Sequence, residues 1–398
     1  MSDLLQEVPA PLEGVRVLDL TRALAGPMTA RLLAELGADV VKLEPPDGDL
    51  VRLVAPPQDR GMSGLYTLAN VGKRNVCVDL RQGEGREIAL DLVRWADAVI
   101  ENYRPGVMEG LGLGWETLHR ENLALVLLSI NGYGSDSPLR GRRAFAPVIH
   151  AVSGVLQYHA EWTGSPLTQL ADNQADINAS LHGTIGLLAA LRSAERTGVG
   201  QHVEVPLFDA LLATYSETPF ALLPEPVHRD ECPLYDAGRH GHVAIAGPPQ
   251  NAWARLREAH GLEDPAPGPR PRAEKAKLRQ RAIEAWMAAQ PDMTTLLDRV
   301  EQAGLAGGRV EGLRDVLLGP VSQQQGLLAH VDDRRGGTRP VVRTPYRFDG
   351  KRRPVPSPAP RRGEHNREVL EELLGYDAER IAALSEADVL QEAAPDAR

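Results

Sequence analysis

The sequence predicts an α/β protein whose larger part is built on a parallel sheet, and two observations indicate this class. Short apolar runs that suit buried strands alternate with amphipathic stretches of helical length, first as Val15–Leu20, residues 27–36 and Ala38–Glu44. The same order of strand, helix and strand returns between Asn75 and Glu101. Each repeat joins two parallel strands through a right-handed crossover, so the pattern favours a parallel sheet with helices on its faces.

The first repeat is bounded by residues that start and stop helices. Pro27 suits the first helical turn, and Gly37 is a natural C-terminal stop. Ligands of parallel sheets bind beyond the carboxyl ends of the strands, which places the loop Thr21–Gly26 and the chain after Glu44 near a site. The G-x-G-x-x-G fingerprint is absent from this loop. A dehydrogenase is therefore disfavoured, although Glu44 superficially resembles a ribose-binding acid.

Polar and basic residues flank the next strands. The predicted strands cover 75–80, 97–101 and 125–130, and a helix is predicted over about 84–95. We expect the flanking side chains to lie near strand ends where a ligand can bind; the alternative is that they are ordinary solvated loop residues. They are Lys73 and Arg74 before the first of these strands, and Asn102, Tyr103 and Arg104 after the second.

A long amphipathic helix is predicted within Gln169–Gln201. On a helical period Asp176, Ser180 and Gly183 share one face, which leaves room for something bulky beside the carboxylate. The leucine-rich remainder anchors the helix in a core. Asp176 is therefore a candidate nucleophile. The alternative is that an aspartate in the first helical turn only satisfies free backbone N–H groups, and Asp172 fits that capping role at least as well.

A smaller α+β domain is expected after the proline-rich stretch 223–233. Residues 235–249 read as a hairpin with its turn at 239–241, and helices are predicted over about 251–260 and 273–289. Beyond Gly307 the chain reads as rich in loops, with a final helix at Asn366–Leu374. The expected limits are 1–225 for the large α/β domain, 226–325 for the small domain and 326–398 for the C-terminal segment.

Composition excludes several classes of protein. A formal net charge of −10 argues against a nucleic-acid partner. Two cysteines, Cys77 and Cys232, are too few for a disulfide framework or a thiolate metal site and suit a reducing cytoplasm. No run of about 18 apolar residues and no signal-peptide pattern occurs, so we expect a soluble cytoplasmic protein without a membrane partner. His240 and His242 are too few for a metal site, and we expect no bound metal.

Several collinear motifs resemble one known family. They are PLEGVRVLDLTRALAGPMTARLLAELGADVVKLEPPDGD, NVGKRNVCVDLR, ADAVIENYRPGVMEGLGLGWETL, SINGYGSDSP and GLLAALRSAERTGVGQHVEV, which follows Asp176. In this order and spacing they look like the family III (CaiB/BaiF-type) coenzyme A transferases, a family that includes formyl-CoA transferase and the α-methylacyl-CoA racemases. The resemblance covers about Pro11 to Tyr215 and returns at the C-terminus in RRGEHNREVLEELLGY.

The resemblance implies a fold, an assembly and a set of site residues. The large domain would be Rossmann-like and built from both ends of the chain, with the small domain inserted, and two ring-like subunits would interlock as a homodimer. Coenzyme A and its acyl thioesters would be substrates, with no permanently bound cofactor. Arginine and lysine suit the phosphates of coenzyme A. The family's nucleophile falls on Asp176, and its coenzyme A contacts fall on Thr21, Arg22, Ala23, Leu24, Ala25, Lys73, Arg74, Asn102, Tyr103 and Arg104.

The implied chemistry uses the carboxylate as a nucleophile. Ionised Asp176 would attack the thioester carbonyl, giving a mixed anhydride and a coenzyme A thiolate, and an aspartyl-CoA thioester would then deliver coenzyme A to a carboxylic acid. We expect the N-terminus of the helix to keep Asp176 charged, and nearby backbone N–H groups to stabilise the oxyanion.

Three positions depart from the family pattern. Leu24 stands where transferase members often have glutamine, Ala146 where many members have an acid, and Ser180 where glycine is common. A racemase needs a histidine and an aspartate on opposite sides of the α-carbon. Phe145 and Ala146 occupy those two positions here, although His150, one helical turn beyond, is a conceivable substitute. The expected substrate pocket contains Phe145, Ala146, His150 and Ser180.

Three functions stay open at this point. The first choice is an acyl-CoA:carboxylate CoA-transferase, the second is an α-methylacyl-CoA racemase or epimerase, and the third is a non-catalytic coenzyme A-binding homologue. The sequence does not identify the acyl donor or the acceptor. A cluster of arginines would either attract a dicarboxylate acceptor or form a solvated or phosphate-binding face; these are Arg140, Arg142 and Arg143.

Overall fold

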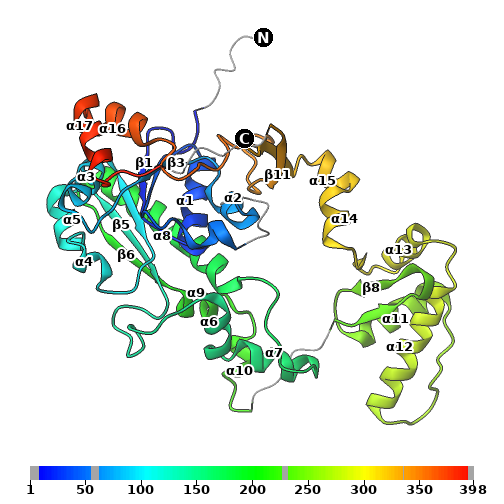
Figure 1. Ribbon diagram of the computed structural model, residues 1–398. Coiled ribbons are helices and arrows are strands. Elements are labelled where there is room, and N and C mark those ends of the chain that lie inside the picture. Colours follow the sequence, from blue (N-terminus) through cyan, green and yellow to red (C-terminus); the bar gives the residue numbers. More distant parts are fainter. Residues whose placement is uncertain (1–8, 55–61, 226–231, 335, 393–398) are drawn as a thin grey trace. The chain divides into compact units, whose positions relative to one another are not determined.

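The structure is a computed structural model that describes residues 9–54, 62–225, 232–334 and 336–392 (Figure 1). The chain divides into two compact units. The larger unit combines Met1–Tyr215 with Gly326–Arg398, and the smaller unit is Ser216–Gln325. The predicted domain limits at 225 and 325 stay a prediction. Among the described residues, no helix combines the length and the apolar character needed to cross a membrane.

A six-stranded sheet forms the centre of the larger unit, and every neighbouring pair in it is parallel. The strand order is β3-β2-β1-β4-β5-β6, so the order reverses between β1 and β4. This confirms the predicted α/β class. The strands are β1 (Arg16–Asp19), β2 (Asp39–Glu44), β3 (Arg74–Cys77), β4 (Ala98–Glu101), β5 (Val126–Asn131) and β6 (His202–Pro206).

Helices cover both faces of this sheet, which explains why the central residues of its strands are mostly apolar. Successive side chains of a strand point to opposite faces. Val17 accordingly belongs to the core formed with α1 (Ala25–Glu35), α8 (Gln174–Thr197) and α9 (Leu207–Thr214). Its neighbour Leu18 belongs to the core formed with α3 (Gly83–Trp95) and the C-terminal helices.

Several further helices of the larger unit, between residues 50 and 163, are short. They are η1 (Leu50–Leu53), α2 (Gly64–Asn70), α4 (Val107–Gly110), α5 (Trp115–Glu121), α6 (Ala146–Val152) and α7 (Val155–Thr163).

The long helix α8 lies directly against the sheet at Gly183. A Cβ atom built there would lie 3.1 Å from Leu128 and 3.2 Å from Ile130, closer than ordinary van der Waals contact. One turn earlier, the Thr29 hydroxyl on α1 donates to the Ser180 carbonyl at 3.2 Å. The prediction of free space on the helix face at Ser180 and Gly183 is therefore wrong, because residues of α1 and β5 fill that space.

The C-terminal segment covers the edge strand β3. The backbone N–H of Asn75 donates to His365 Nδ1 at 3.1 Å, and that of Cys77 donates to Asn366 Oδ1 at 2.9 Å. The helix α16 (Asn366–Leu374) ends at Gly375, as predicted. A second helix, α17 (Ala378–Glu386), follows it, so the prediction that α16 is the final helix is wrong.

The stretch predicted as loops after Gly307 also contains regular structure. The residues described there include β9 (Gly307–Arg309), α14 (Leu313–Leu318), α15 (Pro320–Gln324) and an antiparallel pair, β10 (Leu328–Asp332) with β11 (Thr338–Val342). Each element spans only three to six residues. Their hydrophobic patterns are therefore too short to stand out from loops.

The smaller unit has its own sheet and its own core. β7 (Leu234–Asp236) pairs antiparallel with β8 (His242–Ile245), and a 3-10 turn at Gly238–His240 connects them, which confirms the predicted hairpin. β9 completes this sheet beside β8. The helices α11 (Pro249–His260) and α12 (Arg272–Ala288) confirm the two predicted helices of this unit. The unit also contains α10 (Thr218–Ala221) and α13 (Met293–Gln302), which the sequence did not predict.

Candidate active site at the carboxyl ends of the strands

A pocket of about 450 Å³ opens at the carboxyl ends of β1, β4 and β5, next to the point where the strand order reverses. This is the position at which open parallel sheets bind ligands. Asp176, near the start of α8, lies in its wall. Other lining residues come after β1 (Arg22, Ala23 and Ala25), after β4 (Asn102, Tyr103 and Arg104) and after β5 (Arg140, Arg142, Arg143 and Phe145).

The carboxylate of Asp176 is only partly shielded from the pocket. Burial raises the pKa of Asp176 to about 6, while a hydrogen bond from the backbone N–H of Ala146 lowers it. No basic side chain contributes to this shift. Desolvation therefore sets the direction of the shift, and the contribution expected from the helix N-terminus does not prevent the rise. At pH 7 roughly nine-tenths of such a group is still ionised.

The N-terminus of α8 has no cap from its own sequence. Asn173 occupies the cap position without a side-chain hydrogen bond, and Asp172 is exposed, so the predicted cap at Asp172 is wrong. The acceptor comes from α6 instead. The backbone N–H of Ala175 donates to Nε2 of His150 at 3.2 Å, and the His150 side chain is fully buried.

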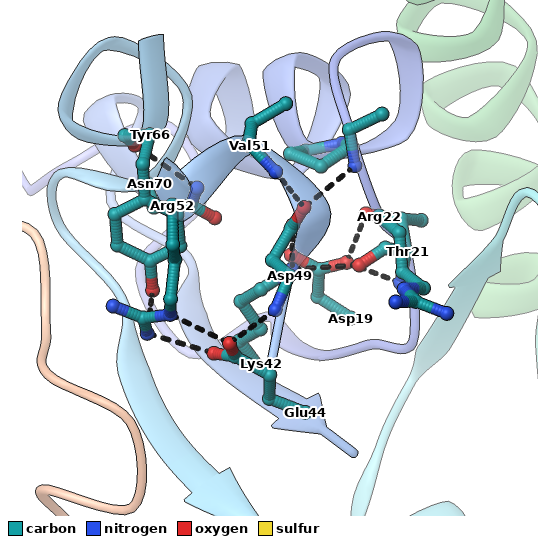
Figure 2. A network of polar contacts seen from close by, with 12 residues as sticks. Asp19, Thr21, Arg22, Lys42, Glu44, Asp49, Val51, Arg52, Tyr66 and Asn70 are labelled. Atoms are coloured by element: carbon teal, nitrogen blue, oxygen red, sulfur yellow. Dashed lines mark hydrogen bonds and ion pairs between the residues drawn. The ribbon is translucent and has the colours of Figure 1, made fainter. Parts of the chain in front are cut away.

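The loop Thr21–Ala23 is held by side chains from β1 and β2 and by Asp49, the residue that caps η1 (Figure 2). Thr21 N–H donates to Asp19 Oδ1 at 2.9 Å, and Lys42 Nζ donates to the Thr21 carbonyl at 2.6 Å. Ala23 N–H donates to Asp49 Oδ1 at 3.0 Å. Ala23 has a φ of 67°, which is rare for a residue with a side chain. These bonds therefore hold the loop in a conformation that it would not adopt readily alone.

Asn102 holds the same loop from the other side of the strand reversal. Its Oδ1 accepts the backbone N–H of Arg22 at 2.8 Å, and its Nδ2 donates to the Arg22 carbonyl at 2.7 Å. The Asn102 side chain thus pairs with the backbone of Arg22 at both polar groups. This contact connects the two loops that form one side of the pocket.

The charges behind the loop form a buried network. Lys73 Nζ lies 2.7 Å from Asp19, Lys42 Nζ lies 3.3 Å from Asp49, and Arg52 Nε lies 2.6 Å from Glu44. Figure 2 shows Asp19, Lys42 and Asp49 beside the loop, with Arg52 between Glu44 and Tyr66. Three cations and three carboxylates balance one another. Hereafter these six residues are called the buried network.

Burial alone would favour the uncharged form of each of these groups, whereas the neighbouring opposite charges favour the charged form. Burial raises the pKa of Asp19, but Lys73 and Lys42 together lower it by more than burial raises it. The net shift of this pKa is therefore downward. Burial lowers the pKa of Lys73 to about 8 in spite of Asp19. The Glu44 carboxylate is occupied by Arg52 and by the amide of Asn75, which leaves little of it for a nucleotide ribose.

The structure brings together six of the ten predicted coenzyme A contacts in the pocket wall: Arg22, Ala23, Ala25, Asn102, Tyr103 and Arg104. Thr21, Leu24, Lys73 and Arg74 do not line the pocket. Lys73 belongs to the buried network, and Arg74 starts β3, where it pairs with Asp39 and Glu368. Direct contacts between any of these residues and coenzyme A stay a prediction.

The predicted substrate-pocket residues separate in the same way. Phe145 lines the pocket and is exposed. Ala146, His150 and Ser180 are buried and do not line it. Ala146 and His150 instead contact the first turn of α8, and Ser180 lies against Thr29.

Two features of the site were missed from the sequence. The first is an apolar part of the pocket wall, formed by Leu50, Val107, Ile130 and Leu207, for which the sequence carries no local signal. The second is the buried network, for which a signal exists: Asp19, Lys42 and Glu44 are charged residues inside otherwise apolar strands. Charges in such strands are rarely tolerated unless they are paired.

Four arginines at the rim of the pocket differ from the buried, paired Arg52 in their exposure to solvent. Arg104, Arg140, Arg142 and Arg143 are exposed, and among the described residues none of them forms an ion pair. These four residues are hereafter called the rim arginines. No group of three His, Cys, Asp or Glu side chains suited to a metal ion occurs within the described part of the chain.

Comparisons with known proteins agree over nearly the whole chain. The model of the family described as CoA-transferase family III matches residues 12–366. The chain is 31% identical to a succinyl-CoA–L-malate CoA-transferase beta subunit from Chloroflexus aurantiacus, over 93% of this chain and 96% of that protein. It is 32% identical to a succinyl-CoA:mesaconate CoA-transferase from Haloarcula hispanica, over 91% of this chain and 96% of that protein.

A solved structure shares the fold. The crystal structure of a CaiB/BaiF family protein from Brucella suis superposes with a TM-score of 0.77 at 29% identity. The match covers 92% of this chain and all of that protein.

Proposed function

The chain belongs to CoA-transferase family III, and we propose that it moves coenzyme A from an acyl-CoA to a carboxylic acid through a covalent intermediate on Asp176. One observation carries this proposal. Asp176 places a carboxylate with no basic partner in the wall of a pocket that exposed arginines also line. A structural carboxylate would be paired or capping, whereas a nucleophile must be ionised and accessible.

The reaction proceeds by four balanced exchanges at carbonyl carbons. An Asp176 oxygen attacks the thioester carbonyl, the C–S bond breaks, and a mixed anhydride and coenzyme A thiolate form. The thiolate attacks the Asp176 carbonyl carbon and releases the donor acid as its carboxylate. The acceptor carboxylate attacks this aspartyl thioester, and the thiolate leaves again. The thiolate then attacks the acyl carbonyl of the acceptor, which restores the Asp176 carboxylate.

This sequence explains why a carboxylate with a raised pKa serves well. Each step exchanges one activated acyl derivative for another, so neither water nor a proton is consumed. A pKa of about 6 leaves Asp176 mostly ionised at neutral pH. Its partial desolvation also makes the anion more reactive than a fully hydrated carboxylate.

The rim arginines and Arg22 are proposed to receive the phosphates of coenzyme A. A guanidinium donates two parallel hydrogen bonds to a phosphate, which suits this ligand. Two of the relatives are named for succinyl-CoA as donor and for malate or mesaconate as acceptor. Succinyl-CoA with a panel of dicarboxylic acids is therefore the first combination to assay on this chain.

The racemase alternative needs a histidine opposite the aspartate, and no histidine occurs among the described residues that line the pocket. Phe145 and Ala146 carry no ionisable side chain. His150 is buried behind the first turn of α8 and accepts a hydrogen bond from Ala175, away from the pocket lining. The transferase proposal needs only the carboxylate that the pocket contains.

Covalent trapping tests the proposal. After incubation with succinyl-CoA, borohydride or hydroxylamine treatment followed by mass spectrometry is expected to mark the peptide that contains Asp176. Asp176→Asn is expected to lose the adduct and at least roughly 10³-fold in transfer rate. Asp172→Asn is the matched control, because this exposed acid four residues earlier lies outside the pocket. The absence of any adduct with a panel of donors would favour the non-catalytic homologue.

The assembly is a separate proposal. We propose that two copies of this chain interlock as a homodimer, as the resemblance implies. A relative named as a beta subunit makes a hetero-oligomer the alternative. Light scattering on the purified chain distinguishes a dimer of about twice 43.2 kDa from a monomer that requires another subunit.

A further inference from the structure

We propose that His150 is a positioning residue that caps α8 and thereby fixes the nucleophile. The inference rests on the proposed role of Asp176. Its starting observation is that α8 carries the nucleophile in its first turn but supplies no side-chain cap of its own. His150 supplies the missing acceptor from another helix, 25 positions earlier in the chain.

The contact is adjacent to the reacting group. Nε2 of His150 accepts the N–H of Ala175, the residue directly before Asp176. The Asp176 carboxylate in turn receives the N–H of Ala146. Ala146 and His150 lie one helical turn apart on α6. One short helix therefore holds the nucleophile at two points, through its backbone and through its side chain.

The contact also fixes the protonation state of the ring. Because Nε2 accepts a hydrogen bond, it carries no proton, and the ring proton resides on Nδ1. Protonation of Nε2 would place one donor against another and break the cap. Burial lowers the pKa of His150, and the carboxylate of Asp172 in the loop before α8 raises it. No other charged group among the described residues acts on the ring.

A pair of amide substitutions tests this role. In His150→Gln the side-chain oxygen reaches the position of Nε2 and can accept the Ala175 N–H. In His150→Asn the shorter amide reaches only the position of Nδ1. Both replacements are polar and uncharged, so they differ mainly in whether the cap is restored.

We expect His150→Asn to lower kcat by roughly 10- to 100-fold, because a small displacement of the nucleophile has effects of that size. The KM for acyl-CoA is expected to change less than about threefold, since His150 does not line the pocket. His150→Gln is expected to retain kcat within about threefold of the unmodified protein. Equal kcat values for the two variants, both folded by circular dichroism, would overturn the inference.

A readout without activity separates this inference from the proposed function. Hydrogen–deuterium exchange of the peptide that contains Ala175 is expected to rise at least fivefold in His150→Asn and to stay unchanged in His150→Gln. If the unmodified chain forms no Asp176 adduct, the proposed function fails even when this exchange pattern is observed. If the adduct forms but exchange at Ala175 is the same in both variants, the cap fails and the nucleophile stands.

Discussion

The buried network and the rim arginines belong to the same unit of the molecule, and their charged groups are in opposite surroundings. In the buried network Asp19, Lys73 and their neighbours are almost wholly removed from water, and each lies within 3.3 Å of an opposite charge. The rim arginines are exposed and have no ion-pair partner among the described residues. Charged residues of one unit thus serve two different tasks.

The difference teaches which charges hold a site and which serve it. Removing an ion pair from water costs several kcal/mol per ion, so a buried pair persists only where its geometry is good and its remaining bonds are made. Here those remaining bonds hold the backbone of Thr21 and Ala23. A solvated arginine costs little to keep unpaired and retains its donors for an anionic ligand.

Breaking the buried network should give the largest change in stability. Lys73→Met leaves Asp19 without its nearest counter-charge in an apolar setting, and such losses cost about 3–5 kcal/mol. Urea denaturation of the variant and the unmodified chain measures the difference. Arg140→Met is the matched control, which we expect within about 0.5 kcal/mol because the residue is exposed. A loss below about 1 kcal/mol for Lys73→Met contradicts the role given to this pair.

Breaking the rim should change binding and leave stability unaltered. Replacing Arg140, Arg142 and Arg143 together by glutamine is expected to raise the KM for acyl-CoA by roughly 10- to 100-fold, because charge-assisted hydrogen bonds to phosphate are lost. Steady-state kinetics at two salt concentrations provide the measurement. High salt should weaken binding by the unmodified chain more than by the variant. An unchanged KM with unchanged salt dependence argues for a solvated face.

Asp176 sharpens the comparison, since it is neither well paired nor fully solvated. Burial holds the pKa of Asp176 at about 6, above the value of about 3.9 for an unfolded chain. The folded state therefore binds the proton of Asp176 more tightly than the unfolded chain does. The stability that this proton contributes is lost as pH rises through 6. Asp176→Asn does not titrate. It is expected to be more stable than the unmodified chain by about 2–3 kcal/mol at pH 8 and about equally stable at pH 4.

Thermal unfolding across pH 4–8 measures that gap, with Asp172→Asn as the control that should show none. A gap that stays constant with pH would contradict the raised pKa. The titration of Asp176 also determines how the transfer rate of the unmodified chain depends on pH. Because the nucleophile is the carboxylate, kcat/KM is expected to rise with pH through about 6 and to level off above about pH 7.

The smallest change in stability is expected at Ala23, whose strained backbone is held by a hydrogen bond to Asp49 of the buried network. A left-handed conformation costs a residue with a Cβ about 1–2 kcal/mol, and glycine adopts it freely. Ala23→Gly is therefore expected to stabilise the folded chain by at most about 1 kcal/mol, since glycine also gains freedom when unfolded. Denaturant midpoints measure the change. A marked loss of stability would contradict this expectation and show that packing of the Ala23 methyl group against the cluster that contains Val51 and Tyr66 outweighs the backbone strain.

The parallel sheet and α8 could be predicted because their signals are local. Alternating strands and helices, Pro27 and Gly375 each report on a few neighbouring residues. The role of Lys73 could not be predicted, since its partner Asp19 lies 54 positions away and the pair reads as an ordinary basic turn. The prediction of the α8 cap failed for the same reason. Asp172 has the sequence spacing of a cap, but His150, 25 positions before Ala175, accepts the Ala175 N–H in the folded chain.

Covering β3 with the C-terminal segment has a consequence for how the protein is made. Strand β3 is an edge strand, and the N–H groups of Asn75 and Cys77 are satisfied by His365 and Asn366. Val369, Leu370 and Ile381 complete the core on the same side. A ribosome must therefore synthesise the whole smaller unit before the sheet that precedes it is sealed. During that interval an unpaired strand edge and an apolar face are available to chaperones or to another nascent chain.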